Sequence, residues 1–340
     1  MKLFNSIFKY ILRTIFLFSI IVIICAISFL IYMFTGEAKK SPNINFGITF
    51  SQIFAEEMGL DWQRVYLSAL DEFNIKKLRL VAYWQKIEPN QGEYFFNDLD
   101  WQINEAGKRN ADVILAVGQK LPRWPECHIP EWAKDLSKEE RENRILIMLT
   151  EIIKHYQDND TIKYWQIENE PFLNFGECPE FDKSFLLKEI SLVRELDKKG
   201  RPIILTASGE LSSWTKPALY ADVLGTTLYR IIWNDRIGHI TYPIPAVFYY
   251  KRANLVKKIT GIDKIIIIEL QAEPWGPKMI YETDEKFQTL SMDLDKFKGI
   301  IDYTYRTGFD EAYLWGFEWW YQRKEQGNDA IWSEAKKLWD

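Results

Sequence analysis

The 340-residue sequence has few of the residues that build metal centres and disulfide frameworks, with three histidines and three cysteines. His128, His155 and His239 are far apart and lack the short spacing of metal ligands, so we do not expect a catalytic metal. The sequence also lacks a glycine-rich phosphate loop and a basic surplus, since 43 Lys and Arg stand against 48 Asp and Glu. An acidic chain repels phosphate backbones. We therefore expect no nucleic acid or nucleotide partner and no cofactor.

The first 40 residues differ from the rest of the chain. Lys2, Lys9 and Arg13 precede an uncharged, mostly apolar run over residues 14–34, and charge returns at positions 37, 39 and 40. Such a run can cross about 30 Å of hydrocarbon as a helix, whereas the apolar stretch of a signal peptide has about 7–15 residues. Basic residues before the run favour a cytoplasmic N-terminus. We expect residues 1–40 to form a cytoplasmic N-terminus and a single-pass transmembrane signal-anchor in the plasma membrane, with a cleaved signal peptide as the alternative.

Residues 41–340, which we expect to lie outside that membrane, alternate between short β-branched runs and amphipathic stretches. Strands are predicted at residues 46–50, 77–82, 111–117, 163–167, 202–206, 223–228, 264–268 and 312–315. Helices are predicted at residues 61–73, 99–109, 137–156 and 181–199, weakly within 212–221, within 285–307, and at 331–338. The alternation predicts an α/β fold, a (β/α)8 TIM barrel. An open doubly wound sheet, the alternative, usually has fewer strands and a phosphate-binding first turn.

Two glutamates, 99 residues apart, stand at the ends of predicted strands. Glu170 lies in the tripeptide Asn169-Glu170-Pro171 after the fourth strand, and Glu269 directly follows the isoleucine run of the seventh. A strand–helix unit takes roughly 30 residues, which agrees with three units between them. Cleavage of a glycosidic bond on a barrel requires two carboxyl groups at the C-terminal ends of strands. One protonates the leaving oxygen, and the other attacks or stabilises the reacting carbon.

These requirements suggest a role for each residue. Glu170 is the candidate acid/base, with a pKa raised by a nearby ionised carboxylate, and Glu269 is the candidate nucleophile. Arg79 is a charge inside strand two that needs a buried partner, and Tyr229 ends strand six, so both are expected to contact Glu269. Other interpretations stay open, because Asn-Glu-Pro can begin a helix, Arg79 can neutralise a structural acid and Tyr229 can be a core aromatic. Glu273 competes with Glu269 as the nucleophile.

Aromatic residues supply a second signal. The sequence contains 14 tryptophans, and many follow predicted strands: Trp84, Trp124, Trp132, Trp214, Trp233, Trp275, Trp315, Trp319 and Trp320. Flat aromatic rings suit the apolar faces of sugars. We expect a carbohydrate-binding cleft on this rim, formed in part by Trp84, Trp124, Trp275, Trp315 and Trp319, although any one of them can instead pack beneath a loop.

Two further expectations concern the same rim. Cys127 and Cys178 follow the third and fourth strands and would lie in neighbouring loops, so a disulfide is expected in an exported domain, with two buried free thiols as the alternative. Glu168 shares strand periodicity with Glu170, and we expect it to point inward one layer deeper, in a supporting role.

These residues resemble glycoside hydrolase clan A, the retaining barrel glycosidases, and in particular its cellulase-like members. The resemblance extends from residue 46 to the C-terminus and rests on Trp165-Gln166-Ile167-Glu168-Asn169-Glu170-Pro171, Ile268-Glu269-Leu270, Arg79, Tyr229 and Trp315. It implies that Asn169 binds the 2-hydroxyl of the sugar being cleaved and that Trp315 floors the central subsite. Gly118-Gln119-Lys120 and Thr227 stand where cellulase-like members often carry histidines, which leaves the sugar open.

The combined expectation is a membrane-anchored retaining glycoside hydrolase that acts on a β-linked polysaccharide or oligosaccharide. A transglycosylase that remodels a cell-envelope glycan would use the same residues. The alternatives are a non-catalytic carbohydrate-binding barrel and a barrel enzyme of unrelated, metal-dependent chemistry. The two glutamates disfavour the first alternative, and the scarcity of histidine disfavours the second.

Overall fold

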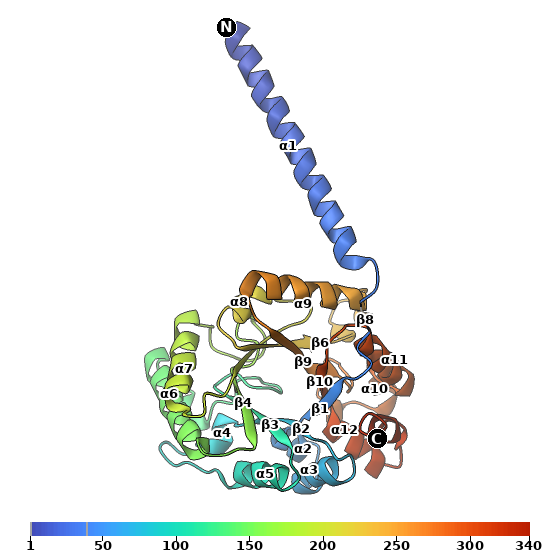
Figure 1. Ribbon diagram of the computed structural model, residues 1–340. Helices are drawn as coiled ribbons and strands as arrows, with labels where there is room; N and C mark the ends of the chain where they lie inside the picture. Colours follow the sequence, from blue (N-terminus) through green and yellow to red (C-terminus); the bar gives the residue numbers. More distant parts are fainter. Residues whose placement is uncertain (1, 39) are drawn as a thin grey trace.

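The computed structural model describes residues 2–38 and 40–340, which form a closed barrel with one long helix extending from it (Figure 1). Lys39, one of the charges that follow the apolar run, lies outside the described residues. The barrel strands pair in parallel, in the order β1-β10-β9-β6-β5-β4-β3-β2. They are β1 (Asn45–Thr49), β2 (Lys77–Val81), β3 (Asp112–Val117), β4 (Ile162–Ile167), β5 (Ile203–Ala207), β6 (Val223–Leu228), β9 (Lys264–Gln271) and β10 (Glu311–Trp315). The predicted (β/α)8 barrel is therefore confirmed.

Helices surround the barrel, as Figure 1 shows. The longer ones are α3 (Trp62–Asp71), α5 (Asn97–Lys108), α6 (Lys138–Tyr156), α7 (Lys183–Leu196), α9 (Ala246–Thr260), α11 (Leu294–Tyr305) and α12 (Phe317–Glu325). Shorter helical segments are α2 (Gln52–Glu57), α4 (Trp84–Ile87), η1 (Glu131–Ala133), α8 (Thr215–Ala218), η2 (Ile280–Glu282), α10 (Glu285–Ser291) and α13 (Ala330–Lys336).

The alternation of side chains along the strands explains why these sequences form a barrel. In β9, Ile266 and Ile268 belong to a small cluster with Ile114, Ile204 and Tyr313, whereas Ile265 and Ile267 belong to the large apolar layer that includes the helices. Successive residues of a strand point to opposite faces, so one isoleucine run fills the barrel and also holds the surrounding helices.

The segment between β6 and β9 was not predicted correctly. It contains an antiparallel hairpin of β7 (Ile231–Asn234) and β8 (Gly238–Thr241), followed by α9. The amphipathic pattern of α9 is weak because Leu255 and Ile259 lie on its exposed side, at 37% and 60% exposure. Two smaller differences are that the region 285–307 forms two helices, because Asp293 caps the second, and that α12 follows β10 directly.

The extending helix is α1 (Lys2–Phe34). Its segment Ser6–Phe34 contains an 18-residue stretch with a mean hydropathy of 3.0 and is long and apolar enough to cross a membrane. A secretory signal sequence near the N-terminus can meet the same criterion, so this property supports an anchor without distinguishing it from a cleaved leader.

Candidate active site

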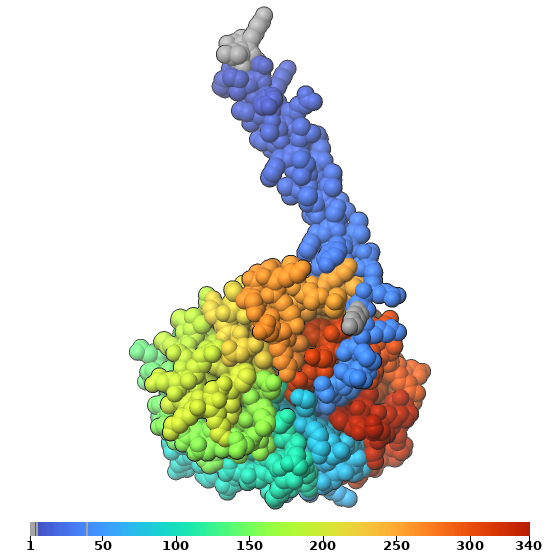
Figure 2. All heavy atoms as spheres, viewed as in Figure 1, coloured from blue at the N-terminus to red at the C-terminus, as the bar shows by residue number. Residues whose placement is uncertain are grey.

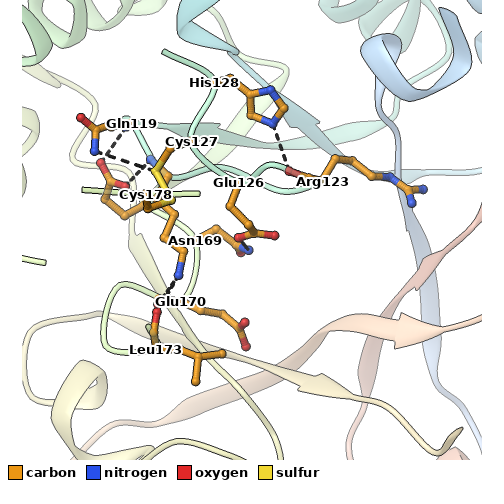
Figure 3. The surroundings of a disulfide bond; sticks show 11 residues. Gln119, Arg123, Glu126, Cys127, His128, Asn169, Glu170, Leu173 and Cys178 are labelled. Atoms are coloured by element: carbon orange, nitrogen blue, oxygen red, sulfur yellow. Dashed lines mark hydrogen bonds between the residues drawn. A yellow bond between two sulfur atoms is a disulfide. The ribbon is translucent and has the colours of Figure 1, made fainter. Parts of the chain in front are cut away.

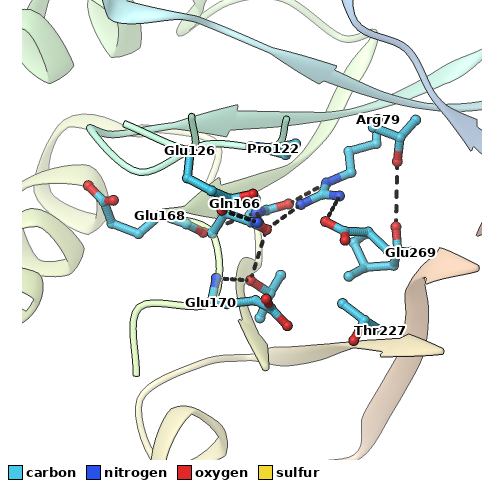
Figure 4. A network of polar contacts seen from close by, with 12 residues as sticks. Arg79, Pro122, Glu126, Gln166, Glu168, Glu170, Thr227 and Glu269 are labelled. Atoms are coloured by element: carbon cyan, nitrogen blue, oxygen red, sulfur yellow. Dashed lines mark hydrogen bonds and ion pairs between the residues drawn. The ribbon is translucent and has the colours of Figure 1, made fainter. Parts of the chain in front are cut away.

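Glu170 reaches the C-terminal end of the barrel through an unusual turn. After β4 ends at Ile167, the backbone φ is +56° at Glu168 and +43° at Glu170. Positive φ is uncommon for residues other than glycine and often marks functional sites. The turn is held where the Glu170 backbone N–H donates to the Thr206 hydroxyl at 2.6 Å. Figure 4 shows the Glu170 side chain pointing toward Glu269 and the Glu168 side chain pointing away.

The expectation that Glu168 points inward is therefore wrong, because strand alternation stops at Ile167. The Glu168 carboxylate instead accepts hydrogen bonds from the backbone N–H groups of Gln119 (2.7 Å) and Lys120 (2.6 Å). It lines a separate cavity of about 570 Å³ between the loop and helices α6 and α7, together with the buried Glu189. Glu168 thus ties the loop after β3 to the loop after β4.

Glu269 lies within β9, which continues three residues beyond the predicted end of the strand. The pairing of β9 shifts on both sides at this point: Thr226 and Thr227 of β6 face Ile267 and Glu269, and the register with β10 also shifts. A β-bulge of this kind changes which face a side chain takes. Neighbouring strand residues normally point to opposite faces. The bulge explains how Glu269 can face the barrel axis although its neighbour Ile268 faces it as well.

Arg79, fully buried in β2, connects the residues around Glu269. Its Nη1 donates to the Glu269 carboxylate at 2.7 Å, its Nη2 to the Asn169 side-chain oxygen at 2.8 Å, and its Nε to the Gln166 side-chain oxygen at 2.7 Å (Figure 4). The Tyr229 hydroxyl donates to the second oxygen of Glu269 at 3.2 Å. One planar guanidinium thus fixes the carboxylate and the amide side by side.

The surroundings of Glu170 are different. Burial raises the pKa of its carboxyl well above the ordinary value, and the neighbouring charges of Glu269 and Glu126 raise it further. Its Oε1 atom is buried and has no hydrogen-bond partner among the residues that the structure describes. Burial without a hydrogen-bond donor disfavours the charged form of a carboxyl group, so this site favours the protonated form of Glu170.

Glu126 is a third carboxyl group at this site, which sequence reasoning missed. Burial raises its pKa to about 8, and the charge of Glu269 acts in the same direction. Its carboxyl accepts a hydrogen bond from the Asn169 side-chain N–H at 3.1 Å. Glu126 lies in the irregular loop after β3, where no strand or helix period could mark it. Trp124 and Cys127, which sequence reasoning singled out in the same loop, were the signals nearby.

The loop that carries Glu126 is bound to the loop that carries Glu170. Cys127 and Cys178 form a disulfide, and the Lys120 ammonium donates to the backbone oxygens of Glu170 (3.2 Å) and Leu173 (2.7 Å) (Figure 3). These contacts hold the two loops together.

Glu170, Glu269 and Glu126 line one cleft of about 680 Å³. Its aromatic walls consist of Phe54, Trp124, Phe175, Tyr229, Trp233, Trp275 and Trp315. Trp124 is 44% exposed, and the Phe175 ring lies 6.0 Å from it and 6.4 Å from Trp275 between ring centroids. Of the five tryptophans expected to form the cleft, Trp124, Trp275 and Trp315 line it, as does Trp233, which also follows a predicted strand.

Trp84 and Trp319 do not line the cleft, so the expectation for these two residues is wrong. Both are buried: the Trp84 indole N–H donates to Glu88 at 2.9 Å, and that of Trp319 donates to Gln288 at 3.0 Å. Both belong to helices that follow barrel strands, α4 and α12, and these helices turn the side chains into the core. Position after a strand is thus insufficient to place a ring in the cleft.

Glu273, the competing candidate for the nucleophile, lies in the cleft but is engaged elsewhere. Both of its carboxylate oxygens accept hydrogen bonds from Arg123, which also donates to Glu318 at 3.2 Å. The Arg123 guanidinium lies 3.7 Å from the ring centroid of Phe54 and 4.2 Å from that of Trp315. This arrangement makes Glu273 part of a buried ion-pair network that supports the aromatic wall.

Comparison with known proteins places the chain near glycoside hydrolases. Residues 61–145 match the family described as Beta-galactosidase, glycoside hydrolase family 42, a clan A family. The chain is 25% identical over 171 residues to Beta-galactosidase BgaA of Clostridium cellulovorans, an alignment that covers 43% of this chain and 25% of that protein. The chain thus spans about a quarter of the length of this curated relative. The resemblance to clan A is confirmed.

Solved structures with a similar fold are also glycosidases. Xylanase 10B from Thermotoga petrophila RKU-1 has a TM-score of 0.53 at 15% identity, covering 81% of this chain and 82% of that one. The exo-beta-1,4-mannosidase Op5Man5 from Opitutaceae bacterium strain TAV5 has a TM-score of 0.55 at 14% identity, covering 83% and 53%. At these identities the likeness establishes the barrel fold. Together, the family match and the fold support a glycosidase.

Proposed function

We propose that this chain is a retaining glycoside hydrolase for β-linked polysaccharide or oligosaccharide, with Glu170 as acid/base and Glu269 as nucleophile. One observation carries the proposal: a buried carboxyl group with a raised pKa and a carboxylate held by an arginine face the same aromatic cleft. Retaining cleavage requires this pair of unlike carboxyl groups. The family match ends at residue 145, before both glutamates, so their roles are argued from the site alone.

In the first step Glu170 donates its proton to the leaving oxygen while Glu269 attacks the anomeric carbon. The bond to the leaving group breaks, and a covalent glycosyl–enzyme ester forms at Glu269. Glu170, now ionised, then removes a proton from a water that attacks the same carbon and releases Glu269. Tyr229 and Arg79 hold the two oxygens of Glu269 in place, so that the attacking oxygen meets the carbon in one orientation.

Asn169 lies beside Glu269 on the same guanidinium, where it would meet the sugar hydroxyl next to the anomeric carbon. This position agrees with the 2-hydroxyl contact implied by the clan A resemblance. The exposed ring of Trp124 and the rings of Trp275 and Trp315 would then contact the apolar faces of the sugar units.

Covalent trapping tests the proposal. A 2-fluoro sugar with a good leaving group should inactivate the wild-type chain and label Glu269, which peptide mass analysis of the labelled protein would show. Reaction of the trap at Glu273, or full turnover by Glu269→Ala on a confirmed substrate, would overturn the assignment of the nucleophile. A chain that binds oligosaccharide but neither turns it over nor accepts the label would be a carbohydrate-binding barrel.

We also propose that residues 1–40 anchor the chain in the plasma membrane and that residues 41–340, the catalytic domain, lie outside the cytoplasm. The length and hydropathy of α1 and the basic residues before it support this arrangement. N-terminal sequencing of the chain isolated from membranes tests it, because a new N-terminus near residue 37 would identify a cleaved leader instead.

A further inference from the structure

The C-terminal end of α1 is fixed against one helix of the barrel. The Phe34 ring lies 5.1 Å from the Phe248 ring of α9 between centroids. The Lys251 ammonium donates to the backbone oxygens of Tyr32 and Thr35, the latter at 2.7 Å, and lies 4.1 Å from the Tyr32 ring centroid. Figure 2 shows α1 meeting the barrel directly over this helix. No long tether therefore separates the apolar span from α9.

This contact coincides with the end of the apolar run. The run over residues 14–34 has no charged residue, and at 1.5 Å per residue its length matches the roughly 30 Å of a hydrocarbon core. If α1 spans a bilayer, one boundary of the hydrocarbon lies close to Phe34. Because Phe34 touches Phe248, α9 then lies at the level of the lipid headgroups.

The stripe of α9 that meets α1 continues along the helix with apolar and basic side chains. Residues three, seven, ten and eleven positions after Phe248 lie on one helical face. They form what we call the α9 stripe: Phe248, Lys251, Leu255, Lys258 and Ile259. Leu255 and Ile259 are 37% and 60% exposed, and Lys258 is exposed. In Figure 1, α9 lies crosswise at the foot of α1, so the stripe extends away from the anchor.

We propose that the α9 stripe lies on the membrane surface, with Leu255 and Ile259 in the interface and Lys258 at lipid phosphates. The inference rests on the proposal that α1 is retained as an anchor. A helix with exposed apolar residues and lysines at its edge is suited to this position, since lysine stems reach from the apolar boundary to the headgroups. Leu219 directly follows the neighbouring helix α8 and is 59% exposed, so its apolar side chain would otherwise lie in solvent.

The docking also sets the orientation of the barrel. Figure 1 shows the helices in a ring around the strands, with α1 leaving from the α9 side of that ring. With α9 on the lipid, the cleft at the C-terminal ends of the strands opens along the membrane rather than toward or away from it.

Site-directed spin labelling of the full chain in lipid vesicles tests the proposal. A nitroxide is attached to Ile259→Cys in a Cys25→Ser background, and its collisions with lipid-soluble oxygen and with a water-soluble nickel chelate are compared. The matched control is Ile147→Cys, an exposed isoleucine (43%) on α6, which α7 and α8 separate from α9 around the barrel. Cys25 itself, labelled in the otherwise unchanged chain, provides the reference for the hydrocarbon.

We expect the label at Ile259 to favour oxygen several-fold over the label at Ile147 and to approach the behaviour of the Cys25 label. Equal, water-like behaviour at Ile259 and Ile147, with Cys25 in hydrocarbon, would overturn the docking while leaving the anchor intact. A water-like Cys25 label would remove the anchor and the docking together. Neither result affects the glycosidase assignment, which covalent trapping tests separately. Far-UV circular dichroism of each variant establishes that the barrel is folded.

Discussion

The two sides of the cleft hold their glutamates in opposite ways. Glu269 is built into a strand and has a charged and a neutral donor on its two oxygens, whereas Glu170 follows a strained turn and has an oxygen without a partner among the described residues. The side of Glu269, the proposed nucleophile, is fixed by strands β2, β4 and β9, and the side of Glu170, the proposed acid/base, by two loops joined by a disulfide. The difference shows how one small space treats two carboxyl groups differently: it supplies donors to both oxygens of Glu269 and buries the Oε1 atom of Glu170 without one, and burial raises the pKa of Glu170.

The largest expected effect comes from replacing Glu269, the proposed nucleophile. Glu269→Gln should lower kcat/KM by on the order of 10⁴-fold or more, because loss of a covalent nucleophile removes the whole two-step route. Steady-state kinetics on a confirmed substrate measure this loss. The matched control is Glu311→Gln, which changes another buried, ion-paired strand glutamate at the opposite end of the barrel. Comparable losses in both variants would indicate a folding defect in place of a chemical role.

Replacing Glu170, the proposed acid/base, should lower kcat/KM by a smaller factor, and this factor should depend on the leaving group. We expect Glu170→Gln to lower kcat/KM by about 10²–10⁴-fold on an unactivated glycoside and far less on an aryl glycoside with an acidic phenol, which leaves without protonation. The ratio of the two losses measures proton donation. An equal loss on both substrates would contradict the role of Glu170 and would assign it a binding contact.

Removing one hydrogen bond to Glu269 should lower kcat/KM by a still smaller factor. Tyr229→Phe removes the hydroxyl that donates to Glu269 while the ring can keep its position beside Trp275, 5.1 Å away between centroids. We expect a loss of about 10-fold in kcat/KM, the effect of one hydrogen bond to a charged group, on activated and unactivated substrates alike. A loss confined to the unactivated substrate would show that Tyr229 acts on the acid side.

Breaking the loop connection should affect mainly the acid side. Cys127→Ser together with Cys178→Ser opens a link across 51 residues and should lower the free energy of unfolding by about 2–4 kcal/mol. Because the disulfide positions the loops of Glu126 and Glu170, we expect a several-fold loss on the unactivated glycoside and almost none on the activated one. Chemical denaturation and kinetics at a temperature where both proteins are folded separate the two effects.

The smallest effect is a shift of the pH profile. Ionised Glu126 raises the pKa of Glu170, so Glu126→Gln should lower that pKa and move the alkaline limb of kcat/KM to lower pH.

Glu126 should also make the stability of the fold depend on pH. The pKa of Glu126 is about 8 in the folded chain and about 4.5 in the unfolded chain, so between these pH values only the folded chain holds the proton. Wild-type stability should therefore fall as pH rises between these values, by at most about 1.4 kcal/mol per unit for this group, and the variant should lack that fall. Superimposable pH–rate profiles of the variant and the wild type would contradict an electrostatic effect of Glu126 on Glu170.

The sequence was most informative where function depends on strands. Glu170, Glu269, Arg79 and Tyr229 could be proposed together because parallel strands of a barrel end on one rim, and their alternation with helices is visible in the sequence. The bulge that turns Glu269 inward does not appear in a hydrophobic pattern, because it depends on pairing with β6 and β10.

Loops and short helices were less predictable. Glu126 and Arg123 lie in an irregular segment, where side-chain direction depends on contacts with distant residues such as Asn169 and Glu273. Trp84 and Trp319 follow strands as closely as Trp124 and Trp275 do, yet the first turn of a helix buries them.

Rescue by azide tests most directly whether the two carboxyl groups act as nucleophile and acid/base. With a β-glycoside carrying a good leaving group, azide should attack the glycosyl–enzyme of Glu170→Ala and give a β-glycosyl azide. In Glu269→Ala, azide should occupy the space of the lost carboxylate, attack the substrate directly and give the α-glycosyl azide. Determination of the anomeric configuration by proton NMR distinguishes the products. The same configuration from both variants, or the two configurations exchanged, would contradict the assignment.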